Sequence, residues 1–391
     1  MEFAFTDEQK MIQDTTIAFL SEVSTSEAVR AAMVTEAGYD ESLWKSVCTD
    51  LYWQAIHIPE AYGGMGLGYV ELVAMMEQMG RFLFCSPFYA TVCLATNALL
   101  VAGTEEQKQK YLPGICEGMT ATLAYTGASA GLSAGQWGSD AVTANYRRNG
   151  DNVVLSGTLR YVPDGHTADL LIIAARLDGT SGNEGIALFT VPADHAGISR
   201  QPLPTMDQTR KLAEITLSDV ELPLAAVMQN EGNAWADLEK IRDLAAIALA
   251  AEQMGGAQQI LDMTVAYSKE RVQFGRMIAS FQAIKHKAAD MMTRVEVARS
   301  SVYYAGCVAQ EALFNSEDPF ATELAEAASI SKSYCSDAFF KNTAEGLQMH
   351  GGVGFTWEYD VHLYFKRAKA SEHLLGNGAW HRERLAGLIL D

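Results

Sequence analysis

The spacing of apolar residues along the chain predicts helices at both of its ends. In several long stretches they recur every three or four residues, which gives a helix one apolar face. Thr6, with Asp7 and Glu8 directly after it, is a typical start of a helix. The clearest helical stretches are residues 70–84, 238–271, 282–314 and 320–349. The last three are long enough to form an antiparallel bundle.

Between the two helical zones, the pattern changes to short β-rich runs. Residues 153–157, 170–174 and 186–191 are rich in Val, Ile and Leu and are bounded by turn residues. The segment Asn149-Gly150-Asp151-Asn152 indicates a hairpin. Closely spaced strands without helices between them favour an antiparallel barrel or sandwich. The sequence therefore predicts a helical domain at 1–120, a β domain at 121–228 and a helical bundle at 229–391.

Composition and charge exclude several functional classes. The 391 residues include 29 Lys and Arg against 48 Asp and Glu, a net charge of −19, and no basic stripe offsets it. Such a field repels phosphate backbones and anionic membranes, which argues against nucleic-acid binding. No stretch approaches the about 20 apolar residues of a membrane helix, and the first residues do not resemble a signal peptide. The six irregularly spaced cysteines fit reduced, mostly buried thiols, so we expect a cytoplasmic protein.

Four phrases of the sequence together resemble the acyl-CoA dehydrogenase family of flavoproteins. In chain order they are Ile58–Gly66, Gly103–Pro113, Glu270–Gly275 followed by Ser280–Ala283, and Leu347–Phe355. Their order and spacing extend the resemblance over essentially the whole chain. It implies an N-terminal helical domain, a middle antiparallel β-barrel and a C-terminal four-helix bundle, in agreement with the three zones.

The resemblance also implies a cofactor, a substrate and partners. The cofactor would be FAD, the substrate an acyl-CoA thioester, and the electron acceptor an electron-transfer flavoprotein or a similar carrier. In the family, two clusters of residues from neighbouring subunits typically serve one FAD. A homo-oligomer or a complex with a paralogous subunit is therefore implied.

Six residues of the third and fourth phrases are the expected FAD contacts of the helical bundle. Arg271 offers a permanently charged fork for the pyrophosphate, Phe274 an aromatic face, and Gln282 an amide for polar cofactor atoms. Glycines beside Gln348 would let the backbone approach the adenosine end closely. They are Gly351 and Gly352. Without the resemblance, Arg271 would be only a surface charge and the two glycines only a turn.

The β domain matches the family more loosely. Thr126-Gly127-Ala128 replaces the usual stretch near the flavin, and a Gly/Ser/Ala-rich insert follows from Ser129 to Ser139. Tyr161 stands where the family usually has Trp, and its ring is expected to stack on the flavin. Pro163, two residues later, has neither a hydroxyl nor an N–H to offer. Thr126 and Tyr161 are therefore the predicted flavin contacts of this domain.

Both carboxylates that family members use as the catalytic base are missing. The reaction removes a proton next to the thioester carbonyl, and this step requires a carboxylate within hydrogen-bond reach. The resemblance places the base at residue 375 or at residue 245. The chain has Leu375 and Ala245 at these positions.

Glu252 is the replacement that the sequence suggests. It lies seven residues after Ala245 on the same predicted helix, so it projects from the same face about two turns further along. It interrupts an otherwise apolar run, where an unpaired charge would be costly. Alternatively, Glu252 pairs with an Arg or Lys of a neighbouring helix, or faces solvent. Asp243 and Glu372 are the other candidate bases.

Two further stretches, Trp357–Tyr364 and Leu374–Asn377, resemble a bacterial subgroup linked to bulky acyl-CoAs, including steroid side chains. In that subgroup two related chains can share active sites, one bringing the base and the other helping to bind FAD. Two alternatives to a self-sufficient dehydrogenase are open: a non-catalytic or half-site subunit of a heteromeric dehydrogenase, and a flavin monooxygenase or oxidase on the same fold. No metal site is expected, because the nearby histidines lack the spacing of ligands. These are His350, His362 and His373.

Overall fold

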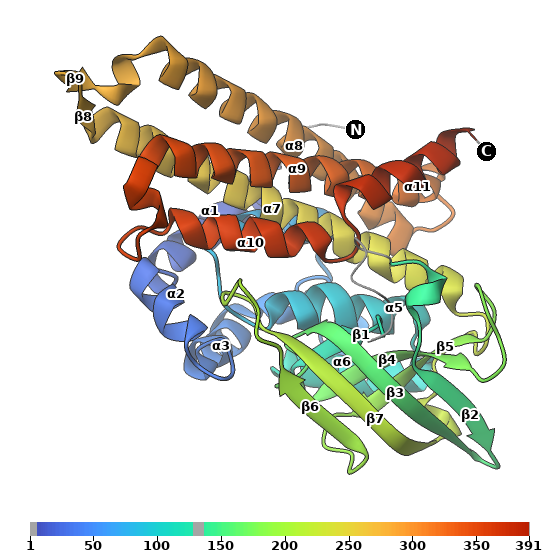
Figure 1. Cartoon of the computed structure of the whole chain (residues 1–391). Helices are drawn as coiled ribbons and strands as arrows, with labels where there is room; N and C mark the ends of the chain where they lie inside the picture. The colour runs from blue at the N-terminus through green and yellow to red at the C-terminus, as the bar shows by residue number, and fades with distance from the viewer. Residues whose placement is uncertain (1–5, 128–136, 391) are drawn as a thin grey trace. The chain divides into compact units, whose positions relative to one another are not determined.

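The computed structural model describes residues 6–127 and 137–390 (Figure 1). Its helices are α1 (Asp7–Val23), α2 (Ser26–Met33), α3 (Glu41–Ser46), α4 (Tyr69–Arg81), α5 (Asn97–Ala102), α6 (Glu105–Cys116), α7 (Trp235–Glu270), α8 (Gln282–Phe314), α9 (Leu324–His350), α10 (Val361–His373) and α11 (Gly378–Leu390). Its strands are β1 (Ala121–Ala124), β2 (Asn145–Asn149), β3 (Asn152–Pro163), β4 (Leu170–Leu177), β5 (Ile186–Pro192), β6 (Ile198–Pro202), β7 (Leu212–Pro223), β8 (Val272–Gln273) and β9 (Arg276–Met277). The mainly helical fold class with a β middle region is therefore confirmed. Most of the Gly/Ser/Ala-rich insert, together with Ala128, lies outside the described residues.

The described residues form two compact units, each assembled from stretches far apart in the sequence. The helical unit contains the chain up to Ala31, Tyr69–Phe84 and the chain from Ala246 onward. The sheet unit contains Ala32–Gly68 and Cys85–Ala245. Helix α7 contributes residues to both units. The three domain boundaries predicted from the sequence stay a prediction.

The helix starts follow from local capping. Thr6 Oγ1 accepts a hydrogen bond from the Gln9 backbone N–H at 3.2 Å, and Gln9 Oε1 accepts one from the Thr6 N–H at 3.0 Å. Thr104 and Gln107 form the same reciprocal pair at the start of α6. Each pair satisfies backbone donors that a helix leaves open at its first turn, and the helix start at Thr6 is the one that the sequence predicts.

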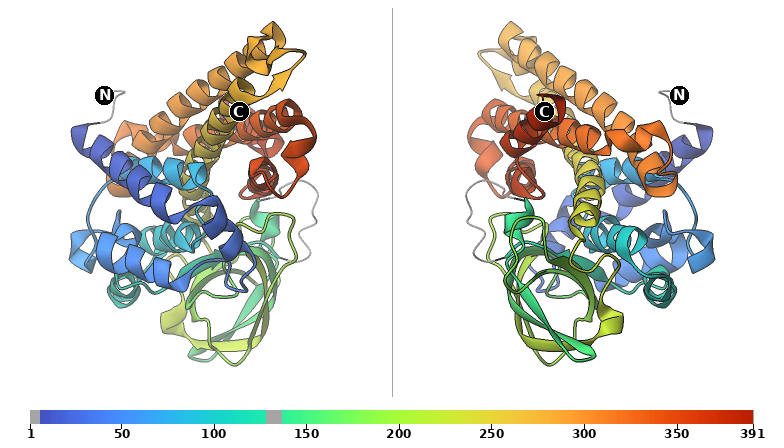
Figure 2. Two further views of the ribbon diagram at one scale, coloured as in Figure 1. Left: turned by 90° about the vertical axis from the view of Figure 1, so that its left-hand side faces the viewer. Right: turned by 90° about the vertical axis from the view of Figure 1, so that its right-hand side faces the viewer.

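The sheet unit is built on a curled, seven-stranded sheet with the order β1-β4-β2-β3-β7-β6, in which β5 pairs with β4 (Figure 2). The predicted hairpin is present: Asn149 pairs with Asn152, and Gly150 has a φ of +60°. However, β4 runs parallel to both β1 and β2. The predicted antiparallel barrel is therefore wrong in this respect, because the sheet is a mixed half-barrel. The β2–β3 hairpin separates β1 from β4 along the chain, which allows the crossover that a parallel pair requires.

Large apolar side chains fill the inside of this sheet. Leu155, Leu171 and Phe189 are fully buried there, and the ring of Tyr146 meets the Phe189 ring edge-on at 5.0 Å between centroids. The alternation of inward and outward residues along the strands collects these side chains on one face. Their burial is the main stabilising contribution within the unit.

In the helical unit, α4 and α7 cross at a very short distance. A Cβ added at Gly255 would lie 1.7 Å from the Glu77 carbonyl oxygen, and one added at Gly80 would lie 1.9 Å from the Glu252 carbonyl oxygen. Both positions therefore require glycine. This crossing fixes the backbone of the α7 segment that carries Glu252.

The helices and the cysteines can also be compared with the sequence predictions. None of the described helices has the length and hydrophobicity that a membrane span requires. Five cysteines are buried and Cys307 is partly exposed, all with free thiols. Burial raises the pKa of the Cys48 thiol to about 12. The Cys48 thiol is therefore protonated near neutral pH.

Candidate active site

Glu252 lies inside the helical unit and forms an ion pair with Arg367 of α10. Arg367 Nη1 donates a hydrogen bond to Glu252 Oε1 at 2.9 Å, and each side chain is only 4% exposed. The sequence leaves three roles open for Glu252: a catalytic base, a partner of an Arg or Lys on a neighbouring helix, or a charge that faces solvent. The contact with Arg367 is the one expected for the second role. The role of catalytic base stays a proposal.

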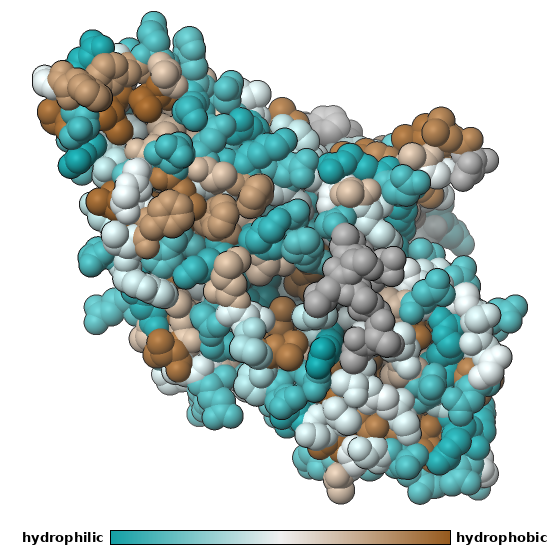
Figure 3. Space-filling view, in the orientation of Figure 1, coloured by the Kyte–Doolittle hydropathy of each residue, from teal (hydrophilic) through white to brown (hydrophobic). Residues whose placement is uncertain are grey.

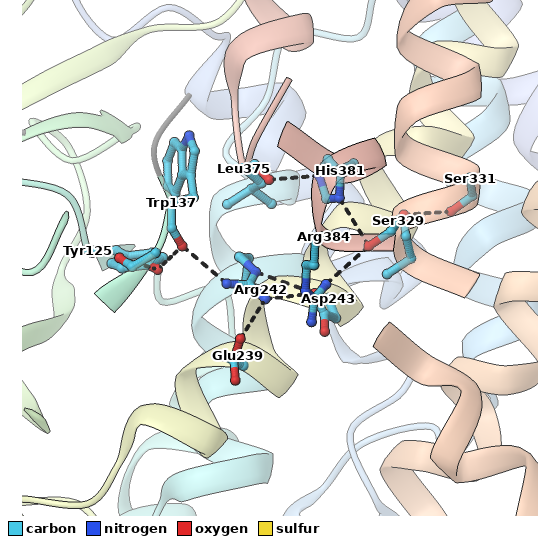
Figure 4. Close-up of polar contacts among 12 residues, drawn as sticks. Tyr125, Trp137, Glu239, Arg242, Asp243, Ser329, Ser331, Leu375, His381 and Arg384 are labelled. Atoms are coloured by element: carbon cyan, nitrogen blue, oxygen red, sulfur yellow. Dashed lines mark hydrogen bonds and ion pairs between the residues drawn. The ribbon is translucent and has the colours of Figure 1, made fainter. Parts of the chain in front are cut away.

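The other two candidate carboxylates are also ion-paired. Asp243 is buried and accepts hydrogen bonds from Nε and Nη2 of Arg242 at 3.4 and 3.3 Å (Figure 4). Arg242 also donates to the Trp137 carbonyl at 3.1 Å. Glu372 is partly exposed and accepts from Lys369 Nζ at 2.8 Å. Each of these two carboxylates therefore already has a cationic neighbour in the structure.

The two positions that carry the base in family members are apolar and buried in this chain. Ala245 is 0% exposed and Leu375 is 2% exposed. Leu375 lies in the turn between α10 and α11 with a left-handed φ of +60°. Its carbonyl accepts a hydrogen bond from His381 Nε2 at 3.0 Å (Figure 4). The backbone of residue 375 is thus held firmly, although its side chain has no acid–base function.

Three of the predicted FAD contacts lie where α7 turns into α8. Arg271, Phe274 and Gln282 are all exposed, and Phe274, at 91%, is almost entirely so. Strands β8 and β9 form a small hairpin here, and exposed hydrophobic residues gather at it (Figure 3). Among the described residues, the Arg271 guanidinium has no carboxylate partner. Its permanent positive charge can therefore bind an anionic ligand.

The other three predicted contacts of the bundle lie at the end of α9. Gln348, Gly351 and Gly352 are exposed, and Gly351 has a φ of +65°. A Cβ added at either glycine would meet nothing within 4 Å. The main chain therefore borders open space, and a ligand can approach it closely.

Tyr267 joins the ends of α7 and α9. Its hydroxyl donates to the His350 carbonyl at 3.2 Å, and the two rings stack at 4.3 Å between centroids. The root of the β8–β9 hairpin and the Gly351–Gly352 turn therefore start from the same end of the helical unit. His350 Nδ1 donates to the Gly346 carbonyl at 2.7 Å, and burial lowers the pKa of this histidine.

Two histidines of the helical unit, His350 and His362, pack against aromatic rings. Among the residues that the structure describes, no group of three or more His, Cys, Asp or Glu side chains is arranged to hold a metal ion. His362 packs edge-on against Trp357, with ring centroids 4.7 Å apart. Burial, with Lys366 and Arg30 nearby, lowers the pKa of His362.

In the sheet unit, both predicted flavin contacts lie at strand β3: Thr126 contacts its backbone, and Tyr161 is part of it. Thr126 is buried, and its Oγ1 donates to the Arg160 carbonyl at 2.8 Å. Tyr161 is partly exposed and has a left-handed φ of +60° at an irregularity in the β3–β7 pairing. A bulge of this kind redirects a side chain, and a strained residue within it often marks a functional site. The Pro163 carbonyl is used internally, as the acceptor from Thr122 Oγ1.

These residues fit FAD by their chemistry. Pyrophosphate requires a cation, which Arg271 supplies, and the adenosine end requires close approach to the main chain, which Gly351 and Gly352 permit. Aromatic surface is offered by Phe274 and Tyr161. Sequence reasoning did not identify Arg367, the partner of Glu252. Lys366 and Arg367 follow the stretch Val361–Phe365, which is apolar and aromatic apart from His362, and this was the available signal.

Comparisons with known proteins agree with this chemistry. The family model "Acyl-CoA dehydrogenase, N-terminal domain" matches residues 6–119, and "Acyl-CoA dehydrogenase, C-terminal domain" matches residues 235–390. A curated relative is "Acyl-CoA dehydrogenase IpdE2" of Mycolicibacterium smegmatis, 34% identical over 370 residues, which are 95% of each chain.

Two solved structures resemble the whole chain. A variant of the steroid acyl-CoA dehydrogenase Tcur3481-Tcur3483 has a TM-score of 0.84 at 30% identity, and the match covers 98% of both chains. The "ChsE4-ChsE5 complex from Mycobacterium tuberculosis" has a TM-score of 0.86 at 26% identity, over 100% of this chain and 99% of that one.

Proposed function

Since the chain belongs to the acyl-CoA dehydrogenase family, and is thus an oxidoreductase acting on acyl-CoA, we propose that it carries out FAD-dependent α,β-dehydrogenation of a bulky acyl-CoA thioester. Electrons would pass to an electron-transfer flavoprotein or a similar carrier. Bound FAD would supply the acceptor for the hydride. The single observation that carries the proposal is the exposed set of Arg271, Gly351 and Gly352 at one end of the helical unit.

The bulky substrate is supported by two independent likenesses. Residues Trp357–Tyr364 and Leu374–Asn377 resemble the subgroup linked to large acyl groups. One structural neighbour is described as a steroid enzyme of this family. Both point to an acyl group larger than a short straight chain.

Within this function, the proton next to the thioester carbonyl has to be taken by a carboxylate of the complex. Glu252 is the proposed base if the chain acts alone. It would have to leave Arg367, since a carboxylate that is stabilised by a guanidinium accepts a proton less readily. Substrate binding would therefore have to compensate the loss of a buried ion pair.

The ion pair itself favours a second function, that of a half-site subunit. Glu252 is already paired, and the two usual base positions hold Ala245 and Leu375. A partner chain of the same family would then supply the base, while this chain contributes FAD contacts. A structural neighbour described as a complex of two chains, ChsE4 and ChsE5, supports this second function.

An anaerobic titration of the purified chain tests the proposal. Flavin absorbance is followed while straight-chain, aromatic and steroid acyl-CoAs are added. Bleaching by a bulky acyl-CoA establishes a self-sufficient dehydrogenase, and its loss in a Glu252→Gln variant that still folds and binds FAD assigns the base. The matched control is Glu296→Gln, which removes an exposed carboxylate of α8.

The remaining outcomes separate the alternatives. Flavin that is bound but bleaches only after a paralogous partner is added assigns the half-site subunit. Flavin that never bleaches but reacts with oxygen when reduced chemically contradicts dehydrogenation and favours a monooxygenase or oxidase. A chain that cannot bind flavin in any complex contradicts the proposed cofactor.

A further inference from the structure

Lys332 of α9 is a charged side chain enclosed in the core of the helical unit. It is 0% exposed, and its ammonium contacts four oxygen atoms. Nζ donates to Ser336 Oγ at 3.0 Å and to the carbonyls of Ser371 at 3.1 Å, Glu372 at 3.1 Å and Gly376 at 3.0 Å. This arrangement places one cation among three backbone carbonyls.

Two of these carbonyls belong to the last turn of α10, and the third lies in the turn that follows. A helix leaves its last carbonyls without intrahelical partners, and its C-terminal end carries partial negative charge. A cation is therefore stabilised there. Lys332 caps α10 and, through Gly376, also ties the following turn to α9.

That turn has an unusual backbone. Leu375 has a φ of +60° and Gly376 a φ of +104°. The left-handed conformation costs a residue other than glycine roughly 1–2 kcal/mol. Such a conformation persists only where the surroundings hold it. Lys332 binds the Gly376 carbonyl of this turn. In addition, His381 Nε2 donates to the Leu375 carbonyl, and the Trp380 N–H donates to Asn377 Oδ1 at 2.9 Å.

The same network reaches the helix segment that carries Glu252. Ser336 Oγ, which accepts from Lys332, donates to Gln253 Oε1 at 3.2 Å. Gln253 Nε2 donates to Ser371 Oγ at 3.1 Å. Lys332 is thus connected by hydrogen bonds to α7, directly beside Glu252, and to the turn that contains residue 375.

We propose that Lys332 is a positioning residue that fixes the turn Leu374–Asn377, and with it residue 375, in the geometry needed for acyl-CoA oxidation. This inference rests on the proposed function, because residue 375 is the position that matches the base of family members. The chain has no carboxylate there, but the turn is capped, strained and tied to α7. Such a strained backbone is accounted for if the turn shapes the substrate site.

Burial and the surrounding acidic groups shift the pKa of Lys332 in opposite directions. Burial lowers the pKa of Lys332 to about 7, against the opposite influence of Glu372, Cys335 and Asp337. An uncharged amine would donate fewer hydrogen bonds to the carbonyls. The tether is therefore expected to be strongest on the acidic side of neutrality.

The first experiment measures hydrogen exchange of the whole chain for Lys332→Met and for the matched control Lys341→Met, which removes an exposed lysine of the same helix. Amides of residues 374–378 should exchange at least tenfold faster in Lys332→Met, with α1 and α4 unchanged. If Lys332→Met does not fold, Lys332→Gln and Ser336→Ala weaken the same contacts more gently. Unchanged exchange in the turn in all folded variants would overturn the tether, whatever the chain's activity.

The second experiment separates positioning from mere stability. With the FAD-loaded chain, or the heteromer if the chain needs a partner, the limiting rate of flavin reduction should fall at least tenfold in Lys332→Met. The apparent Kd for acyl-CoA should change by less than about threefold, and Lys332→Gln should recover part of the rate. Loosened exchange with an unchanged limiting rate overturns the positioning role. Absence of reduction in the wild type as well contradicts the proposed function instead, and the exchange data then still decide the tether.

Discussion

Arg367 of α10 donates a hydrogen bond to Glu252 of α7 at 2.9 Å, and both side chains are about as buried as core residues. The two residues are 115 positions apart in the sequence. The ion pair therefore links α7 to α10, and each charge stabilises the other in the interior of the unit.

Breaking the pair on one side should destabilise the chain strongly. Glu252→Gln or Arg367→Met is expected to lower the free energy of unfolding by about 3–5 kcal/mol, because the remaining residue stays buried after it has lost its oppositely charged neighbour. The double variant Glu252→Met with Arg367→Met should cost less than the sum of the two single changes. Urea unfolding measures these values, and Glu296→Gln, which changes an exposed carboxylate, should cost less than about 1 kcal/mol. Additive costs in the double variant would mean that the two charges are not coupled.

A carboxylate placed at residue 375 should act as a base if the turn is in its functional geometry. Leu375→Glu is expected to speed acyl-CoA-driven flavin reduction by about 10²-fold or more over Leu375→Gln, since a positioned general base contributes roughly that factor. The amide variant controls for shape and polarity at the same site. Equal rates for the two variants would show that residue 375 does not reach the substrate.

Arg271 should contribute to FAD affinity and little to stability. It is exposed and has no carboxylate partner among the described residues, so Arg271→Ala should leave the unfolding midpoint unchanged. Hydrogen bonds to a charged group are worth about 1.5–3 kcal/mol, which corresponds to roughly a 10- to 100-fold weaker Kd for FAD. Calorimetric titration of the flavin-free chain measures this constant. Arg382→Ala, at an exposed arginine paired with Asp337, is the control and should bind FAD normally.

Local signals predicted the elements well, because capping and periodicity are properties of neighbouring residues. Thr6 begins a helix, and Asn149–Asn152 turns a hairpin. The parallel pairing of β1 with β4 could not be predicted, since strand pairing depends on residues far apart in the sequence.

In the candidate site, too, local signals could be read from the sequence, whereas contacts between distant residues could not. The sequence identified Glu252 as a charge in an apolar run but not Arg367 as its partner. Lys332 was missed, although a lysine between Ser331 and Ser333 in a stretch of small residues was a comparable signal. The resemblance pointed to residue 375, but only the backbone revealed that its turn is strained and tethered.

The crossing of α4 and α7 should tolerate no side chain at Gly255. A Cβ there would lie 1.7 Å from the Glu77 carbonyl oxygen, so Gly255→Ala has to push the helices apart. The expected cost is about 3 kcal/mol, at the upper end for overpacked cores. Gly138→Ala is the control, because a Cβ at that glycine would meet nothing within 4 Å. Thermal unfolding of both variants decides the matter, and equal midpoints would contradict the close crossing.

His57 should make the chain less stable in acid. It is fully buried in the sheet unit, and its Nε2 donates to Asn97 Oδ1 at 2.9 Å. Burial lowers the pKa of His57 to about 4, whereas an unfolded chain titrates near 6.5. Between these values the unfolded state binds the proton more readily, so stability is complete above pH 6.5 and is lost progressively as the pH falls to about 4. The loss amounts to about 3 kcal/mol. Unfolding followed across this range should show a flatter profile for His57→Gln, while His286→Gln, at an exposed histidine, should follow the wild type. A profile for His57→Gln as steep as that of the wild type would assign the acid sensitivity to other groups.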